Sequence, residues 1–136
     1  MQYDLALLAD QCSKFGWVST LKGADQLGVS LEPETTLLFA NLHEEGEDTF
    51  IGFEGFTWHT HGGLMFSDPR GFYIELEYTD VLPGLADKSL LVCELWVRGA
   101  LSDRWLTHRD YVSDLKHMQD GDEVRIRPIH APRSGA

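Results

Sequence analysis

Long apolar segments are missing from this 136-residue sequence, and so are the features of an export signal. No hydrophobic run approaches the roughly 20 residues that a helix needs to cross a bilayer. The opening residues, MQYDLALLADQC, contain Asp4 and Asp10 but no Lys or Arg. A secretory signal instead opens with basic residues and ends at a site of small ones. We therefore expect a mature cytoplasmic protein that does not span a membrane.

Cysteine is scarce, and the usual enzyme motifs are absent. The two cysteines, Cys12 and Cys93, cannot build a disulfide framework and form no Cys-x-x-Cys pair. Each lies on an apolar stripe, where a free cysteine behaves as a small hydrophobic residue, so we expect two buried structural thiols. The chain also lacks a phosphate-binding glycine loop, a dinucleotide fingerprint and a serine elbow. These absences favour a protein that is not an enzyme and needs no cofactor.

Basic residues are few: 11 Lys and Arg stand against 22 Asp and Glu, for a net charge of −11. The charge is −8 over residues 1–54, −4 over 55–97 and +1 over 98–136. Such a surplus repels nucleic-acid phosphates and anionic membranes, and it attracts a partner with a basic surface. Net negative charge also keeps a protein soluble, and this simpler explanation stays open.

Hydrophobic periodicity predicts an α+β fold. We expect a mostly antiparallel sheet of about six or seven strands, with an N-terminal helix and a C-terminal helix packed on one face. Residues 1–130 form a single domain in this interpretation, and 131–136 form a flexible tail. The expected helices are 4–15, opened by Asp4 and ended by Gly16, and a second that begins at the Thr107–Asp110 capping pattern. The expected strands are 17–21, 36–43, 49–53, 56–61, 72–79, 89–98, 104–107 and 123–129.

The segment between strands 36–43 and 49–53 is a turn made almost entirely of acids. It carries Glu44, Glu45, Glu47 and Asp48 at the tip of an expected β-hairpin. A cluster of carboxylates on an exposed turn suits contact with a basic protein, because unlike charges accelerate association. We name these four residues as candidate partner-binding residues, with exposed Trp or Tyr side chains as anchors.

A second candidate site is built on His59 and His61. Residues i and i+2 of a strand share a face about 6.5–7 Å apart, so two imidazoles can converge on one metal ion. If strand 56–61 pairs with strand 72–79, matching of the apolar faces places Glu75 and Glu77 beside them. Two His and two Glu would suit a divalent metal such as zinc, with metal-activated water as the nucleophile of an enzyme.

In its general character the whole chain resembles the small immunity proteins of bacterial polymorphic toxin systems. The resemblance lies in one compact, acidic, aromatic-rich α+β domain without catalytic residues, and no single motif carries it. It implies a cytoplasmic, bacterial protein of toxin–antitoxin type that binds and neutralises a cognate basic toxin. Two alternatives stay open: the metal-dependent enzyme described above, and a small-ligand binding domain with aromatic side chains lining a pocket.

Overall fold

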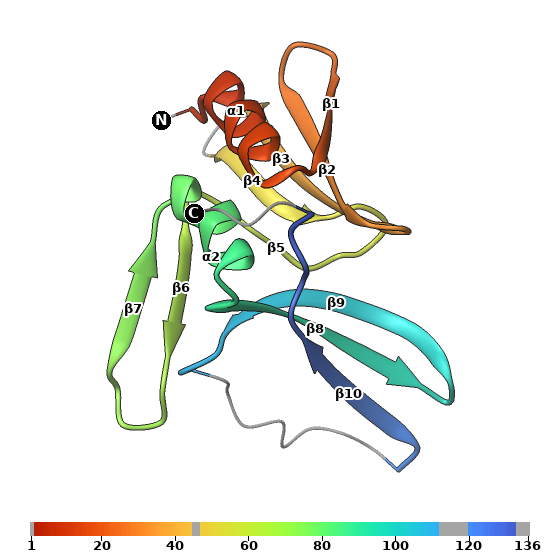
Figure 1. Ribbon diagram of the computed structural model, residues 1–136. Coiled ribbons are helices and arrows are strands. Elements are labelled where there is room, and N and C mark those ends of the chain that lie inside the picture. The colour runs from red at the N-terminus through yellow and green to blue at the C-terminus, as the bar shows by residue number, and fades with distance from the viewer. Residues whose placement is uncertain (1, 45–46, 112–119, 133–136) are drawn as a thin grey trace.

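The computed structural model describes residues 2–44, 47–111 and 120–132 (Figure 1). The described part contains two α-helices, one 3-10 helix and ten strands in three antiparallel sheets. The helical elements are α1 (Leu5–Phe15), η1 (Tyr78–Asp80) and α2 (Val81–Ala86). The strands are β1 (Val18–Lys22), β2 (Gln26–Glu32), β3 (Thr35–Glu44), β4 (Glu47–Phe53), β5 (His59–Thr60), β6 (Leu64–Ser67), β7 (Tyr73–Leu76), β8 (Leu90–Val97), β9 (Ala100–His108) and β10 (Asp122–Arg127). The α+β class and the antiparallel pairing are confirmed, whereas the single sheet of six or seven strands is wrong.

Helix α1 begins and ends where its capping residues predict. The Asp4 side chain accepts a hydrogen bond from the Leu7 backbone N–H at 3.1 Å, which satisfies one of the free donors of the first turn. Gly16 ends the helix in the left-handed conformation, with φ of 85°. Leu8, Cys12 and two further residues at helical spacing are buried on one side. The N-terminal helix is therefore confirmed.

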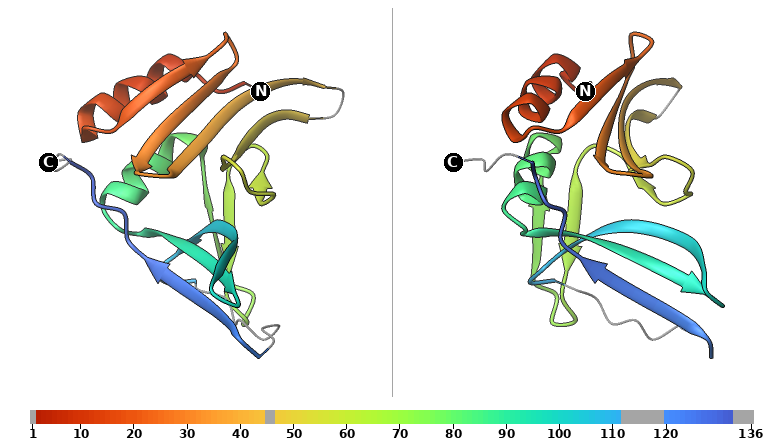
Figure 2. Two further views of the ribbon diagram at one scale, coloured as in Figure 1. Left: turned by 90° about the vertical axis from the view of Figure 1, so that its right-hand side faces the viewer. Right: turned by 45° about the vertical axis from the view of Figure 1, so that its right-hand side comes forward.

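The first sheet is a meander in the order β1-β2-β3-β4-β5. Alternate residues of β2 (Leu27, Val29, Leu31) and of β3 (Leu37, Phe39) are buried, and α1 covers this face (Figure 2). The β3–β4 hairpin matches the expected strands 36–43 and 49–53. Strand β2 was not expected, because the glycines at each end of segment 23–28 are typical of a turn.

The second sheet has the order β10-β8-β9, so β8 is central, as its apolar sequence indicates. Leu90 and Val92 of β8 and Leu106 of β9 join the same core as the first sheet and α2. The buried hydrophobic residues of the described part thus form one cluster, to which the two larger sheets, α1, α2 and Leu64 of β6 contribute.

The third sheet is the β6–β7 hairpin, which replaces the expected pairing of 56–61 with 72–79. Only His59 and Thr60 of the earlier segment form a strand, and they pair with β4. Strand β7 instead pairs with β6, which lies in the segment expected to be a loop. The short turn after Asp68 favours the pairing of β6 with β7. The Asp68 carboxylate stabilises this turn by accepting hydrogen bonds from the backbone N–H groups of Arg70 and Phe72. A closed local turn costs less chain entropy than the longer connection.

The expected C-terminal helix is wrong where the structure describes it. Thr107 and His108 are buried at the end of β9, where His108 is the partner of Leu90 in β8. The capping pattern is therefore overridden by the pairing of two apolar strands. The remainder of the expected helix, residues 112–119, lies outside the described residues. The second described α-helix is α2, in the segment 80–87 that precedes β8.

Candidate functional site

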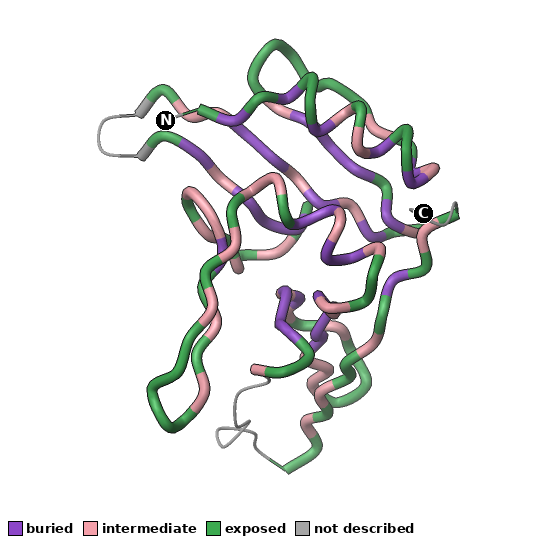
Figure 3. The backbone as a smooth tube through the Cα atoms, turned by 60° about the vertical axis from the view of Figure 1, so that its left-hand side comes forward, coloured by how far each residue is buried: buried purple, intermediate pink, exposed green. Residues whose placement is uncertain are grey.

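The β6–β7 hairpin projects from the side of the molecule and has two different faces (Figures 1 and 3). Leu64 pairs with Leu76 and Phe66 with Ile74; all four are buried or half-buried, and Leu64, Phe66 and Leu76 pack on the core. The opposite face is formed by the alternate pairs, Met65 with Glu75 and Ser67 with Tyr73, and all four are exposed. The alternation of a strand therefore presents a second face that the domain leaves uncovered.

This uncovered face is rich in large apolar side chains. The exposed fractions are 66% for Met65, 64% for Phe72 in the adjoining turn and 61% for Tyr73. Met65 and Tyr73 are diagonal neighbours on this face, and exposed apolar side chains on neighbouring positions mark contact sites more often than isolated ones do. We call Met65, Phe72, Tyr73 and Glu75 the hairpin surface.

The turn that carries Phe72 is held in place by an ion pair. The Arg70 guanidinium lies 2.9 Å from the Asp68 carboxylate, and it also stacks 5.1 Å from the centre of the Phe72 ring. Its hydrogen bonds, with those of two backbone N–H groups, hold the pKa of Asp68 below its ordinary value. The aromatic side chain therefore sits on an ordered turn, and the only basic side chain of the hairpin is already paired.

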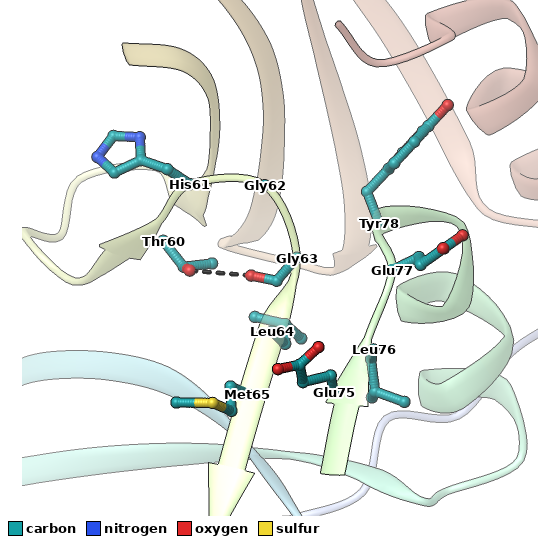
Figure 4. Close-up of a pocket in the computed structure, with 10 residues that line it drawn as sticks. All are labelled: Thr60, His61, Gly62, Gly63, Leu64, Met65, Glu75, Leu76, Glu77 and Tyr78. Carbon is teal, nitrogen blue, oxygen red and sulfur yellow. Dashed lines mark hydrogen bonds between the residues drawn. The ribbon is translucent and has the colours of Figure 1, made fainter. Parts of the chain in front are cut away.

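A cleft of about 560 Å³ lies at the base of the hairpin (Figure 4). We call it the basal cleft. Its walls come from the segment that joins β5 to β6 and from the end of β7 with the residues that follow it. It is lined by Thr60, His61, Gly62, Gly63, Leu64, Met65, Glu75, Leu76, Glu77 and Tyr78. Met65 and Glu75 belong to both the basal cleft and the hairpin surface, so the two are continuous.

Two glycines shape this cleft. Gly62 has φ of 77°, a conformation that side chains rarely adopt, and it turns the chain from β5 into β6. A Cβ on Gly63 would lie 2.2 Å from the carbonyl oxygen of Leu76, so only glycine fits this close strand contact. The Thr60 hydroxyl closes the turn by donating to the Gly63 carbonyl at 3.0 Å. The wall of the cleft is therefore an ordered turn.

The lining of the cleft is acidic, with Glu75 and Glu77 and without Lys or Arg. In Figure 4 the Glu75 carboxylate lies in front of the paired strands, and the Met65 side chain extends from β6 on the side away from β7. The His61 imidazole and the Tyr78 ring point away from those strands. The cleft thus combines a carboxylate with an apolar wall, which suits a cation with an aliphatic stem.

The four residues of the metal hypothesis are only partly brought together. His61, Glu75 and Glu77 line the basal cleft, whereas His59 does not. The two exposed imidazoles lie 5.0 Å apart, centre to centre, and their Nδ1 atoms face the backbone carbonyls of Thr57 and Thr49. Within residues 2–44, 47–111 and 120–132, no three His, Cys, Asp or Glu side chains are arranged to hold a metal ion. The metal site stays a sequence-based hypothesis without a converged geometry in this part of the chain.

The acidic turn lies at the end of the β3–β4 hairpin, as expected. Glu44 and Glu47 are Cα partners at the ends of the two strands, and Asp48 is exposed. Glu45 lies outside the described residues. Its role in partner binding stays a prediction, as do those of the other three.

The structure contains a buried ion-pair network that the sequence analysis did not identify. Glu94 and Arg104 pair at 2.7 Å with side chains only 5% and 6% exposed. Arg104 also stacks 4.7 Å from the Phe56 ring, and Arg127 links Glu94, at 3.5 Å, to Glu32 in the first sheet. Burial alone raises the pKa of Glu94, but the hydrogen bonds from the two arginines outweigh it and the pKa is lowered. The network joins the two larger sheets.

The remaining candidate groups for chemistry are buried. His108 is 7% exposed and lies beside the Phe66 and Tyr111 rings. Cys12 and Cys93 are buried free thiols, as expected, and burial raises the pKa of each to about 11. A thiol with so high a pKa is protonated at neutral pH, so neither is suited to act as a nucleophile.

No protein-family model matches the chain, and neither a curated protein nor a solved structure shows significant similarity to it. Over the described residues, every helix is too short or too polar to cross a membrane. Inferences about function therefore rest on the surface of the molecule itself.

Proposed function

We propose that this chain is a protein-binding domain that engages a basic partner through the hairpin surface. The observation that carries the proposal is that Met65 and Tyr73, both more than 60% exposed, share one face of the hairpin with Glu75, and that Phe72 in the adjoining turn is exposed as well. Aromatic and Met side chains are enriched at protein interfaces, where a few of them supply most of the binding energy. Their place on an ordered hairpin lowers the entropic cost of binding.

The distribution of charge supports a basic partner. Five basic side chains already form ion pairs within the chain: Lys22, Arg70, Arg104, Arg125 and Arg127. Each such pair cancels one positive and one negative charge, so the surplus of acids still leaves a surface field that is negative at long range. Such a field accelerates encounter with a cationic protein and weakens as salt is added.

The resemblance to immunity proteins narrows this proposal to a domain that binds and neutralises a cognate basic toxin. In that case the acidic turn at Glu44, Glu45, Glu47 and Asp48 supplies a second contact, beyond the hairpin surface. Neutralising these four acids should then slow association and reduce its salt dependence, while loss of Tyr73 should mainly accelerate dissociation.

Site-specific photo-crosslinking tests the proposal. A photoreactive residue at Tyr73 in the producing cells should capture one defined protein, and the same residue at Val18 should not. Val18 is a matched control, since its exposed fraction is 69% and it lies on β1, at the other end of the first sheet from β5. The captured protein should be basic, and its affinity should fall steeply with salt. Equal capture at both positions, or an acidic partner, would contradict the proposal.

A further inference from the structure

We infer that the basal cleft receives a lysine or arginine side chain from an extended, basic segment of the partner protein. The inference rests on the proposed function and adds the place and the chemistry of the contact. It follows from three properties of the described residues: the charge of the cleft, its apolar lining, and its continuity with the hairpin surface.

The charge selects a cation. The lining includes two carboxylates and no basic side chain, and the rest of the chain adds a long-range negative field. An anionic ligand would meet repulsion from Glu75 and would find no basic side chain in the lining, while the Glu77 carboxylate points away from Glu75 toward the start of η1 in Figure 4. A cation entering beside Glu75 forms a charge-assisted hydrogen bond, which is about twice as strong as a neutral one.

The apolar wall selects a cation that carries an aliphatic stem. Met65 lines the cleft on the same face of the hairpin as Glu75, whereas Leu64 and Leu76 line it from the face that packs on the core. Lysine and arginine bury their methylene stems along apolar surface while the charged group reaches a polar one. The thioether of Met65 adapts its shape to such a stem. A bare metal ion would use none of this surface.

Because the basal cleft is continuous with the hairpin surface, a protein segment fits this site better than a small free cation does. Met65 belongs to the cleft, and Tyr73 lies on the same face of the hairpin, next to the turn that carries Phe72. A polyamine would fill the cleft and leave both aromatic rings exposed. An extended segment that places one basic side chain in the cleft can cover Met65 and Tyr73 with its neighbouring residues.

The test uses the full chain with three probes: a fluorescein-labelled peptide of alternating Lys and Val, its counterpart with Glu in place of Lys, and spermidine. Fluorescence anisotropy measures binding, and backbone amide shifts in NMR spectra map it. We expect saturable binding of the Lys peptide alone, with shifts at Gly62, Gly63 and Met65. The Glu75→Gln variant should weaken this binding about tenfold, as expected for loss of a charged hydrogen bond.

Matched variants distinguish binding in the cleft from nonspecific attraction to the net negative charge of the protein. Glu34→Gln removes the same charge from an exposed glutamate in the β2–β3 turn and should leave peptide affinity within about twofold, since a remote exposed charge is screened. Tyr73→Ser should weaken the peptide several-fold. The inference is overturned if the Lys peptide does not bind saturably, if both glutamate variants weaken it equally, or if spermidine competes fully while Tyr73→Ser has no effect. If the protein captured at Tyr73 is insensitive to Glu75→Gln, the inference fails and the proposed function stands.

Discussion

Replacement of Arg104 by methionine provides a direct test of the buried ion-pair network. Arg104→Met keeps a chain of similar width against Phe53 and Phe56 but removes the guanidinium that pairs with Glu94 at 2.7 Å. Glu94, with a side chain 5% exposed, then keeps only the more distant Arg127, at 3.5 Å. Breaking a buried pair from one side typically costs about 3–5 kcal/mol. We expect a loss near the lower end, about 3 kcal/mol, because Arg127 compensates in part.

Urea unfolding at pH 7, followed by circular dichroism, measures this loss. For a chain of this size, about 3 kcal/mol corresponds to a fall in Tm of roughly 10 °C. The double variant Glu94→Leu/Arg104→Met removes both charges and should recover most of the stability, because an apolar pair of similar volume often replaces a buried ion pair at little cost. A single variant within about 1 kcal/mol of the wild type, which is the range of exposed ion pairs, would refute the reasoning. A double variant as unstable as the single one would refute it as well.

The pH dependence of the same pair provides a second readout. The pKa of Glu94 is lower in the folded protein than in the unfolded chain, so the unfolded state binds more protons as pH falls. The contribution of this pair is therefore complete above the unfolded pKa of about 4.3 and is lost as pH falls through the folded value. In the Arg104→Met variant Glu94 is still buried but has lost this arginine, so burial favours the protonated form of its carboxyl group. The difference in the free energy of unfolding between wild type and variant should consequently decrease below about pH 4.5.

Two further predictions concern the hairpin and the thiols. Gly63→Ala places a Cβ 2.2 Å from the Leu76 carbonyl oxygen, so β6 and β7 must separate at that end. Amide exchange at Met65 and Glu75 should accelerate in this variant while Leu90 in β8 keeps its protection; unchanged exchange at Met65 would contradict the close contact. Cys12 and Cys93, buried and with pKa values of about 11, should not react with a thiol reagent at pH 8 unless urea is added. Rapid modification of the native protein would show that these sites open.

Elements whose caps, turn residues and apolar pattern all lie within one segment could be predicted from the sequence. Helix α1 has its N-cap at Asp4, its left-handed glycine at Gly16 and an apolar stripe between them, all within one segment. The β3–β4 hairpin and the central strand β8 likewise combine apolar runs with turn residues at their ends. Such features act over a few residues, so no knowledge of distant contacts is needed to predict them.

Elements decided by distant partners could not be read in this way. Segment 56–61 is apolar enough for a long strand, but only His59 and Thr60 pair, because β7 is closer along the chain to β6. The pattern Thr107–Asp110 has the residues of a helix start, yet Thr107 and His108 extend β9 against β8. In both cases several strand partners competed, and the sequence pattern does not give their relative free energies.

The sequence by itself determined the α+β class, the antiparallel strands, the N-terminal helix, the buried cysteines and the negative field, because these depend on composition and local periodicity. Only the tertiary structure decided that Met65 and Tyr73 share an uncovered face and that Glu75 borders a cleft with His61. It also decided that Glu94 is buried against Arg104. Strand alternation allows two faces, and which of them is covered depends on the rest of the chain packing against it.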